Sequence, residues 1–151
     1  MGQFITGTLE RNEAGATYEG INYDRWLYLR VSKDRLLAIF DPIAMTTDLH
    51  IGSEYSVLVT EYSPADLEIL PRKPAKLTRT HNWYGKVVST YWRPPEMQYR
   101  CATLTYRNHK GVLVNTQHGW MLLHSSDFVQ PPDYGNFIQW NQVRLDLLAV
   151  L

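Results

Sequence analysis

Hydrophobic and polar residues alternate along most of this chain, which is the pattern of β-strands that bury one face. The alternation is clearest in residues 24–31, where Leu27, Leu29 and Val31 fall on the face expected to be buried. Residues 36–40 are continuously apolar, as in a strand that is covered on both sides. Strands are predicted over residues 4–11, 24–31, 36–40, 54–62, 84–92, 99–106, 111–115, 119–123 and 143–151.

Residues 63–70 are predicted to form a short helix instead. Ser63 is placed to cap this helix, Pro64 suits its first position, and Pro71 would end it. The next segment, 71–76, holds two prolines and three cations. Because proline limits strand pairing, this segment is predicted to be a connector.

The order of strands and turns partly repeats on the two sides of the connector. Residues 5–11 can be aligned with 83–89, which places Gly7 on Gly85. The sequence therefore predicts an all-β protein of two tandem small barrels, the first in residues 1–72 and the second in residues 73–151.

The type of barrel is left open between three alternatives. A glycine inside the first strand lets that strand bend enough to serve both sheets, which favours an OB-like five-stranded barrel. Residues 118–131 locally resemble the end of an SH3-like barrel, with a Gly-Trp strand, a short Ser-rich turn and Val129. A single larger barrel that holds a small ligand is also compatible with the length of the chain.

The composition, with 44% hydrophobic and 20% charged residues, is that of a folded globular protein. Cys101 is the only cysteine, so no internal disulfide can form. No segment has the features of a secretion signal, and no apolar run approaches the roughly 20 residues of a membrane helix. We therefore expect a cytoplasmic protein with no membrane partner.

The net charge is zero over the whole sequence, but the charges are unevenly distributed. Residues 72–110 contain nine Lys or Arg residues and one acidic residue, Glu96, which gives a net charge of +8. Charge asymmetry of this kind attracts polyanions or an acidic protein partner.

The same basic window also carries six Trp and Tyr residues. Aromatic rings stack on nucleic-acid bases, and Lys and Arg neutralise phosphates, so the combination predicts a surface that binds single-stranded nucleic acid. The main predicted contacts are Trp83, Tyr84, Lys86, Trp92, Arg93 and Arg100. A second patch is predicted on the outer face of the strand at 24–31, and its members are Trp26, Tyr28 and Arg30.

Motifs of catalysis and of cofactor binding are absent from the sequence. It contains no CxxC, HxH or HExxH spacing for a metal, no G-x-S-x-G elbow, and no glycine-rich phosphate or dinucleotide loop. We therefore predict that the protein is not an enzyme and needs no metal or other cofactor.

Two functions follow from these observations. The first is non-enzymatic binding of single-stranded DNA or RNA, as an accessory subunit. The alternative is a protein-interaction subunit of a larger complex, which docks an acidic or hydrophobic partner through the basic half or its aromatic residues.

Overall fold

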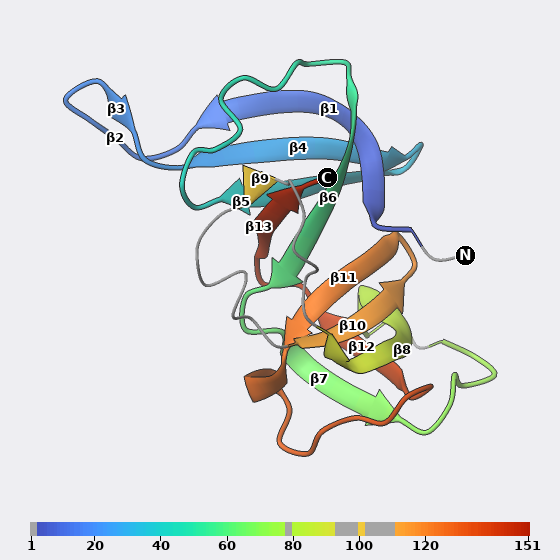
Figure 1. Ribbon diagram of the computed structural model, residues 1–151. Coiled ribbons are helices and arrows are strands. Elements are labelled where there is room, and N and C mark those ends of the chain that lie inside the picture. Colours follow the sequence, from blue (N-terminus) through green and yellow to red (C-terminus); the bar gives the residue numbers. More distant parts are fainter. Residues whose placement is uncertain (1–2, 78–79, 93–99, 102–110) are drawn as a thin grey trace.

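The computed structural model describes residues 3–77, 80–92, 100–101 and 111–151, and within them it confirms the predicted all-β class (Figure 1). The helical element of the described residues is one short 3-10 turn, η1 (Ser125–Asp127). The strands are β1 (Ile5–Ala14), β2 (Thr17–Tyr18), β3 (Ile21–Asn22), β4 (Arg25–Ser32), β5 (Arg35–Asp41), β6 (Glu54–Glu61), β7 (Ala65–Leu70), β8 (Trp83–Trp92), β9 (Arg100–Cys101), β10 (Gly111–Thr116), β11 (Gly119–His124), β12 (Phe137–Asn141) and β13 (Leu145–Val150).

Five strands close into a barrel, called here the main barrel: β1, β4, β5, β13 and β6. Antiparallel pairings join β6 to β1, β1 to β4, and β4 to β5. The last strand, β13, closes the ring, because it pairs in parallel with β5 and antiparallel with β6. In β4, Leu27 and Leu29 point into this barrel and are buried, as their alternation predicts.

Between β6 and β13 the chain forms a second group of strands, called here the inserted unit (β7, β8, β10, β11 and β12), whereas β9, from the same stretch, pairs with β13 of the main barrel. The strands of the inserted unit lie in the order β7-β12-β8-β10-β11, and η1 follows β11. A parallel bridge between Leu122 and Thr60 joins β11 to β6 of the main barrel. Figure 1 shows the inserted unit below the main barrel, and the chain passes between them along β6 and β13.

The strand pairing does not follow the expected division of the chain at residues 72 and 73. A barrel built from residues 1–72 alone lacks β13, which is the strand that closes it. In addition, one connected cluster of buried side chains runs through both units, from Leu27 and Leu29 to Trp83 and Trp140. The main barrel therefore depends on both ends of the chain.

The predicted helix at 63–70 is wrong, because residues 65–70 form strand β7. This strand pairs with β12, and Ile69 lies opposite Ile138. Ser63 and Asp66 have φ angles of 49° and 53°, in the left-handed region, which an α-helix does not allow. Of the strand predicted at 99–106, Arg100–Cys101 forms β9, and the remainder lies outside the described residues.

Gly7 in β1 and Gly85 in β8 each allow close approach of a neighbouring strand. A Cβ atom on Gly7 would collide with the carbonyl oxygen of Arg30, and one on Gly85 would lie 2.5 Å from the carbonyl oxygen of Asn115. A side chain at either position would force the paired strands apart. These are the glycines that the sequence aligns with each other, and they have the same packing role in β1 and in β8.

Candidate nucleic-acid interface

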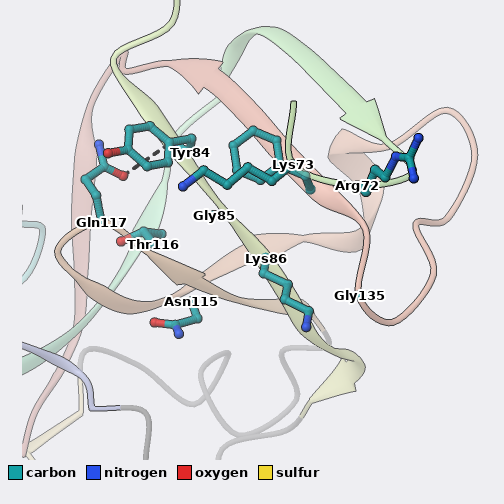
Figure 2. A pocket seen from close by; sticks show the side chains of 10 residues that line it. Arg72, Lys73, Tyr84, Gly85, Lys86, Asn115, Thr116, Gln117 and Gly135 are labelled. Atoms are coloured by element: carbon teal, nitrogen blue, oxygen red, sulfur yellow. Dashed lines mark hydrogen bonds between the residues drawn. The ribbon is translucent and has the colours of Figure 1, made fainter. Parts of the chain in front are cut away.

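A groove with a volume of about 400 Å³ lies on the inserted unit, over strands β8, β10 and β12 (Figure 2). We call it the basic groove, because Arg72, Lys73 and Lys86 stand around it. The full lining is Arg72, Lys73, Tyr84, Gly85, Lys86, Asn115, Thr116, Gln117, Gly135 and Phe137.

The alternation of β8 brings Tyr84 and Lys86 to this groove. Trp83, Gly85 and Val87 point inward and are buried, so Tyr84 and Lys86 on the opposite face point outward. Gly85, which lies between Tyr84 and Lys86, has no side chain, so β8 lies close against β10 at this point.

The backbone of Tyr84 is fixed on two sides by Gln117. The amide N–H of Tyr84 donates to Oε1 of Gln117 at 3.1 Å, and the N–H of Gln117 donates to the carbonyl of Tyr84 at 3.3 Å. The Tyr84 ring is stacked near Phe137, with 6.0 Å between centroids and 28° between planes. An aromatic face held in this way can stack on a planar ligand with little loss of side-chain entropy.

Within the described residues, no acidic side chain neutralises the charge of the basic groove. No acidic residue is among the described residues that line it, and Arg72, Lys73 and Lys86 have no ion-pair partner in the part of the chain that the structure describes. The Lys86 ammonium lies 5.9 Å from the ring centroid of Tyr134. These groups together suit a ligand that carries negative charge and a flat, unsaturated ring.

The second predicted patch lies on the outer face of β4, with its three residues on one side of the strand as alternation requires. Trp26 packs on Phe40, with 5.1 Å between ring centroids. Tyr28 lies under the guanidinium of Arg11, at 4.2 Å from the ring centroid. Both rings are partly exposed.

The cations of this β4 face are already paired with acids, unlike those of the basic groove. Arg30 donates two hydrogen bonds to Glu10, at 2.8 and 3.2 Å, and this contact holds the pKa of Glu10 below its ordinary value. Arg11 pairs with Glu13 in the same manner. The β4 face is therefore aromatic and close to neutral, which makes it a weaker phosphate site than the basic groove.

The prediction that Trp83 presents its ring on the outer surface is wrong. Its side chain is fully buried and stacks on Trp140, with 5.8 Å between centroids and 13° between planes. Its indole N–H donates to Oε1 of Gln142 at 2.7 Å, so the polar atom is satisfied inside the protein. The reason is that alternate residues of a strand point to the same face, and Trp83 shares the inward face of β8 with Gly85 and Val87.

Of the remaining predicted contacts, Trp92 is not among the residues that line the basic groove. Trp92 is partly buried and packs near Phe4, at 6.1 Å between ring centroids, in a small cluster beside Leu122. Arg93 lies outside the described residues. Arg100 belongs to β9, where its backbone pairs with Val150 of β13. The side chain of Arg100 is not among those that the structure describes.

Several residues of the basic groove were missed by the sequence analysis. Arg72 and Lys73 were noticed as part of a charged connector, but nothing local showed that this connector runs beside β8. Gln117 and Phe137 carry no sequence signal of a binding role. Their positions follow from the pairing of β8 with β10 and β12, which joins residues distant in the sequence.

Comparisons with protein-family models, with curated proteins and with solved structures find no significant match for this chain. Within the described residues, no three His, Cys, Asp or Glu side chains lie close enough together to hold a metal ion. The same part of the chain contains no helix with the length and apolarity needed to cross a bilayer.

Proposed function

We propose that the protein binds single-stranded nucleic acid in the basic groove, without catalysis and as an accessory subunit. The observation that carries the proposal is the set of three cations around Tyr84 that have no acidic partner in the described part of the chain. Phosphates would pair with Arg72, Lys73 and Lys86, and a base would stack on the Tyr84 ring. Single strands suit this arrangement better than a duplex, because their bases are free to reach an aromatic face.

We further propose that the main barrel is OB-like and the inserted unit SH3-like. The order of neighbouring strands, β1-β4-β5-β13-β6, with a parallel pair at β5 and β13, supports the first assignment. The five strands of an OB barrel are neighbours in the same order. The order β7-β12-β8-β10-β11, with a 3-10 turn before β12, supports the second. On this interpretation, the SH3-like unit is inserted before the last strand of the OB-like barrel.

The β4 face, with Trp26, Tyr28 and Arg30, is proposed as a secondary contact. OB-type barrels engage oligonucleotides on their second and third strands, which here are β4 and β5. Because Arg30 is paired with Glu10, a phosphate at this face would first have to displace a carboxylate. We therefore expect substitutions here to weaken binding less than substitutions in the basic groove.

The proposal predicts that Lys86→Glu weakens binding to labelled oligo-dT and oligo-U of about 15 nucleotides. At about 50 mM salt we expect a loss of affinity of at least about tenfold, because an attractive charge becomes repulsive next to the phosphates. Tyr84→Ala should weaken binding by about five- to 100-fold through the loss of stacking, whereas Tyr84→Phe should bind as the original chain does. The measurement is fluorescence anisotropy of the labelled oligonucleotide, since the buried Trp83 is a poor reporter of the groove.

Lys33→Glu is the matched control for charge. Lys33 is exposed on the turn between β4 and β5 of the main barrel, so its reversal changes the net charge equally but leaves the groove intact. Equal losses in Lys33→Glu and Lys86→Glu would indicate a general charge effect and would contradict the proposal. So would binding that does not weaken between about 50 and 200 mM salt.

A further inference from the structure

A turn before β12 carries an exposed aromatic ring to the rim of the basic groove. The side chain of Tyr134 is 74% exposed, although tyrosine is ordinarily covered in part. Its neighbour in the turn, Gly135, lines the groove. In the view of Figure 2, Gly135 and Tyr84 lie at opposite ends of the groove. The groove therefore has an aromatic residue at each end.

The turn that carries Tyr134 is bonded to β8. The N–H of Gly135 donates to the carbonyl of Val87 at 3.1 Å, and the N–H of Val87 donates to the carbonyl of Asn136 at 2.9 Å. Within the turn, the N–H of Asp133 donates to Oδ1 of Asn136 at 2.8 Å. Gly135 has a φ angle of 84°, in the left-handed region that glycine adopts readily. The backbone of Tyr134 is thus held in place from both sides.

Lys86 lies between the two aromatic residues. Its side chain follows the turn, because a Cβ atom on Gly135 would lie 3.8 Å from Cε of Lys86. Its ammonium lies over the ring of Tyr134, at 5.9 Å from the centroid. Tyr84 precedes Lys86 by two residues on the same face of β8, which places their Cα atoms about 6.6 Å apart. The order along the groove is therefore ring, cation, ring.

Successive nucleotides of a single strand present the matching order of base, phosphate and base. A base can stack on each ring, and a cation between the rings can pair with the phosphate that joins the two nucleotides. The contact of Lys86 with Tyr134 is at the outer limit of a cation–π interaction, so the ammonium can leave the ring for a phosphate. The flexible four-carbon side chain of lysine permits this movement.

We propose that the basic groove binds two successive nucleotides, with one base on Tyr84, the next base on Tyr134, and the phosphate between them on Lys86. This inference rests on the proposed function and specifies its smallest ligand, a dinucleotide with one internal phosphate. Arg72 and Lys73 remain for the phosphates on either side. Tyr134 lies outside the basic window 72–110, so the charge pattern of the sequence did not include it.

The first test is Tyr134→Ala, measured by anisotropy with labelled oligo-dT at about 50 mM salt. We expect affinity to fall by about five- to 100-fold through the loss of one stacked base, whereas Tyr134→Phe should bind as the original chain does. Tyr18→Ala is the matched control. Tyr18 is 67% exposed on β2, away from the groove, and its removal should leave the affinity unchanged.

The second test uses two unlabelled competitors of the labelled oligo-dT. One is a dinucleotide of two thymidines joined by a single phosphodiester, and the other is thymidine 5′-monophosphate. The dinucleotide should compete at a concentration at least about tenfold lower, because it supplies two bases. The monophosphate carries the greater negative charge, so charge alone predicts the opposite order.

The third test examines the contact between Lys86 and the internal phosphate. A dinucleotide with a neutral methylphosphonate linkage should compete at least about fivefold more weakly than the phosphodiester against the original chain. With Lys86→Ala the two dinucleotides should compete equally, because the group that distinguishes them has been removed. If Lys86→Ala preserved the full difference, Lys86 would not hold the internal phosphate, and the inference would be overturned.

The results separate this inference from the proposed function. If Lys86→Glu and Tyr84→Ala weaken binding of oligo-dT but Tyr134→Ala does not, the groove binds nucleic acid without a second stacking position. That result overturns the inference alone, as does equal competition by the dinucleotide and the monophosphate. If labelled oligo-dT and oligo-U do not bind the original chain, the proposed function fails and the inference fails with it.

Discussion

A chain that ends at Arg144 is expected to lose its folded main barrel. This truncation removes β13, whose residues Leu145, Leu147 and Ala149 are fully buried, together with the pairings to β5 and β6. The loss of a buried leucine costs about 2–5 kcal/mol, and a domain is stable by only about 5–15 kcal/mol. Urea unfolding followed by tryptophan fluorescence and far-ultraviolet circular dichroism should show no cooperative transition for residues 1–144.

A chain that ends at Val150 is the control for this truncation. It loses one hydrogen bond, from the N–H of Leu151 to the carbonyl of Ser56, and should keep a cooperative transition. A fragment of residues 1–72 should fail to fold for the same reason as residues 1–144. If either truncated chain unfolded cooperatively, with a slope like that of the whole chain, the main barrel would not need β13.

The strands of the main barrel were predictable because each carries its own signal. In β4, alternation alone placed Leu27 and Leu29 inside and Tyr28 outside, and the structure agrees. The helix at 63–70 was predicted from Ser63 and Pro64, which are local signals of a helix start. There the pairing of β7 with β12 outweighs a weak local preference, because a short segment gains more from a sheet partner than from its own propensity.

The candidate site was only partly predictable, because a charge window sums residues from both faces of a strand. The window 72–110 includes Tyr84 and Lys86, which share the outer face of β8 and line the basic groove. It also included Trp83, which lies on the opposite face of the same strand and points inward. The closure of the main barrel by β13 could not be predicted, since it depends on a pairing between the two ends of the chain.

A buried carboxylate marks the point where the chain passes between the two units. Glu61, the last residue of β6, is fully buried. Its Oε1 accepts hydrogen bonds from the indole N–H of Trp140 and the amide of Val143, each at 3.2 Å, and its Oε2 accepts one from the amide of Arg144 at 2.9 Å. One side chain therefore holds the end of β6, the end of β12 and the segment that returns to β13.

The protonation of Glu61 links this junction to pH. Burial raises its pKa from 4.5 to about 7, and the N–H donors oppose the rise. Because the folded state binds the proton more tightly than the unfolded state, the stability gained from Glu61 is fully present below about pH 4.5 and is lost as the pH rises through 7. The change in the free energy of unfolding is on the order of 3 kcal/mol.

Glu61→Ala is accordingly expected to lower stability strongly and to remove this pH dependence. The substitution leaves the donors of Trp140, Val143 and Arg144 without a partner, which costs about 1–3 kcal/mol for each unsatisfied group. The difference in free energy of unfolding between the two chains should be larger at about pH 5 than at about pH 8. Urea denaturation across this pH range measures the difference. The comparison separates Glu61 from His118 and His124, because both chains contain these histidines. Burial lowers the pKa values of the two histidines, so their contribution to stability changes with pH in the opposite direction. Glu54→Ala, at the exposed start of the same strand, is the control and should leave the pH dependence of the free energy of unfolding unchanged. If Glu61→Ala also left this pH dependence unchanged, the carboxylate of Glu61 would not be its source.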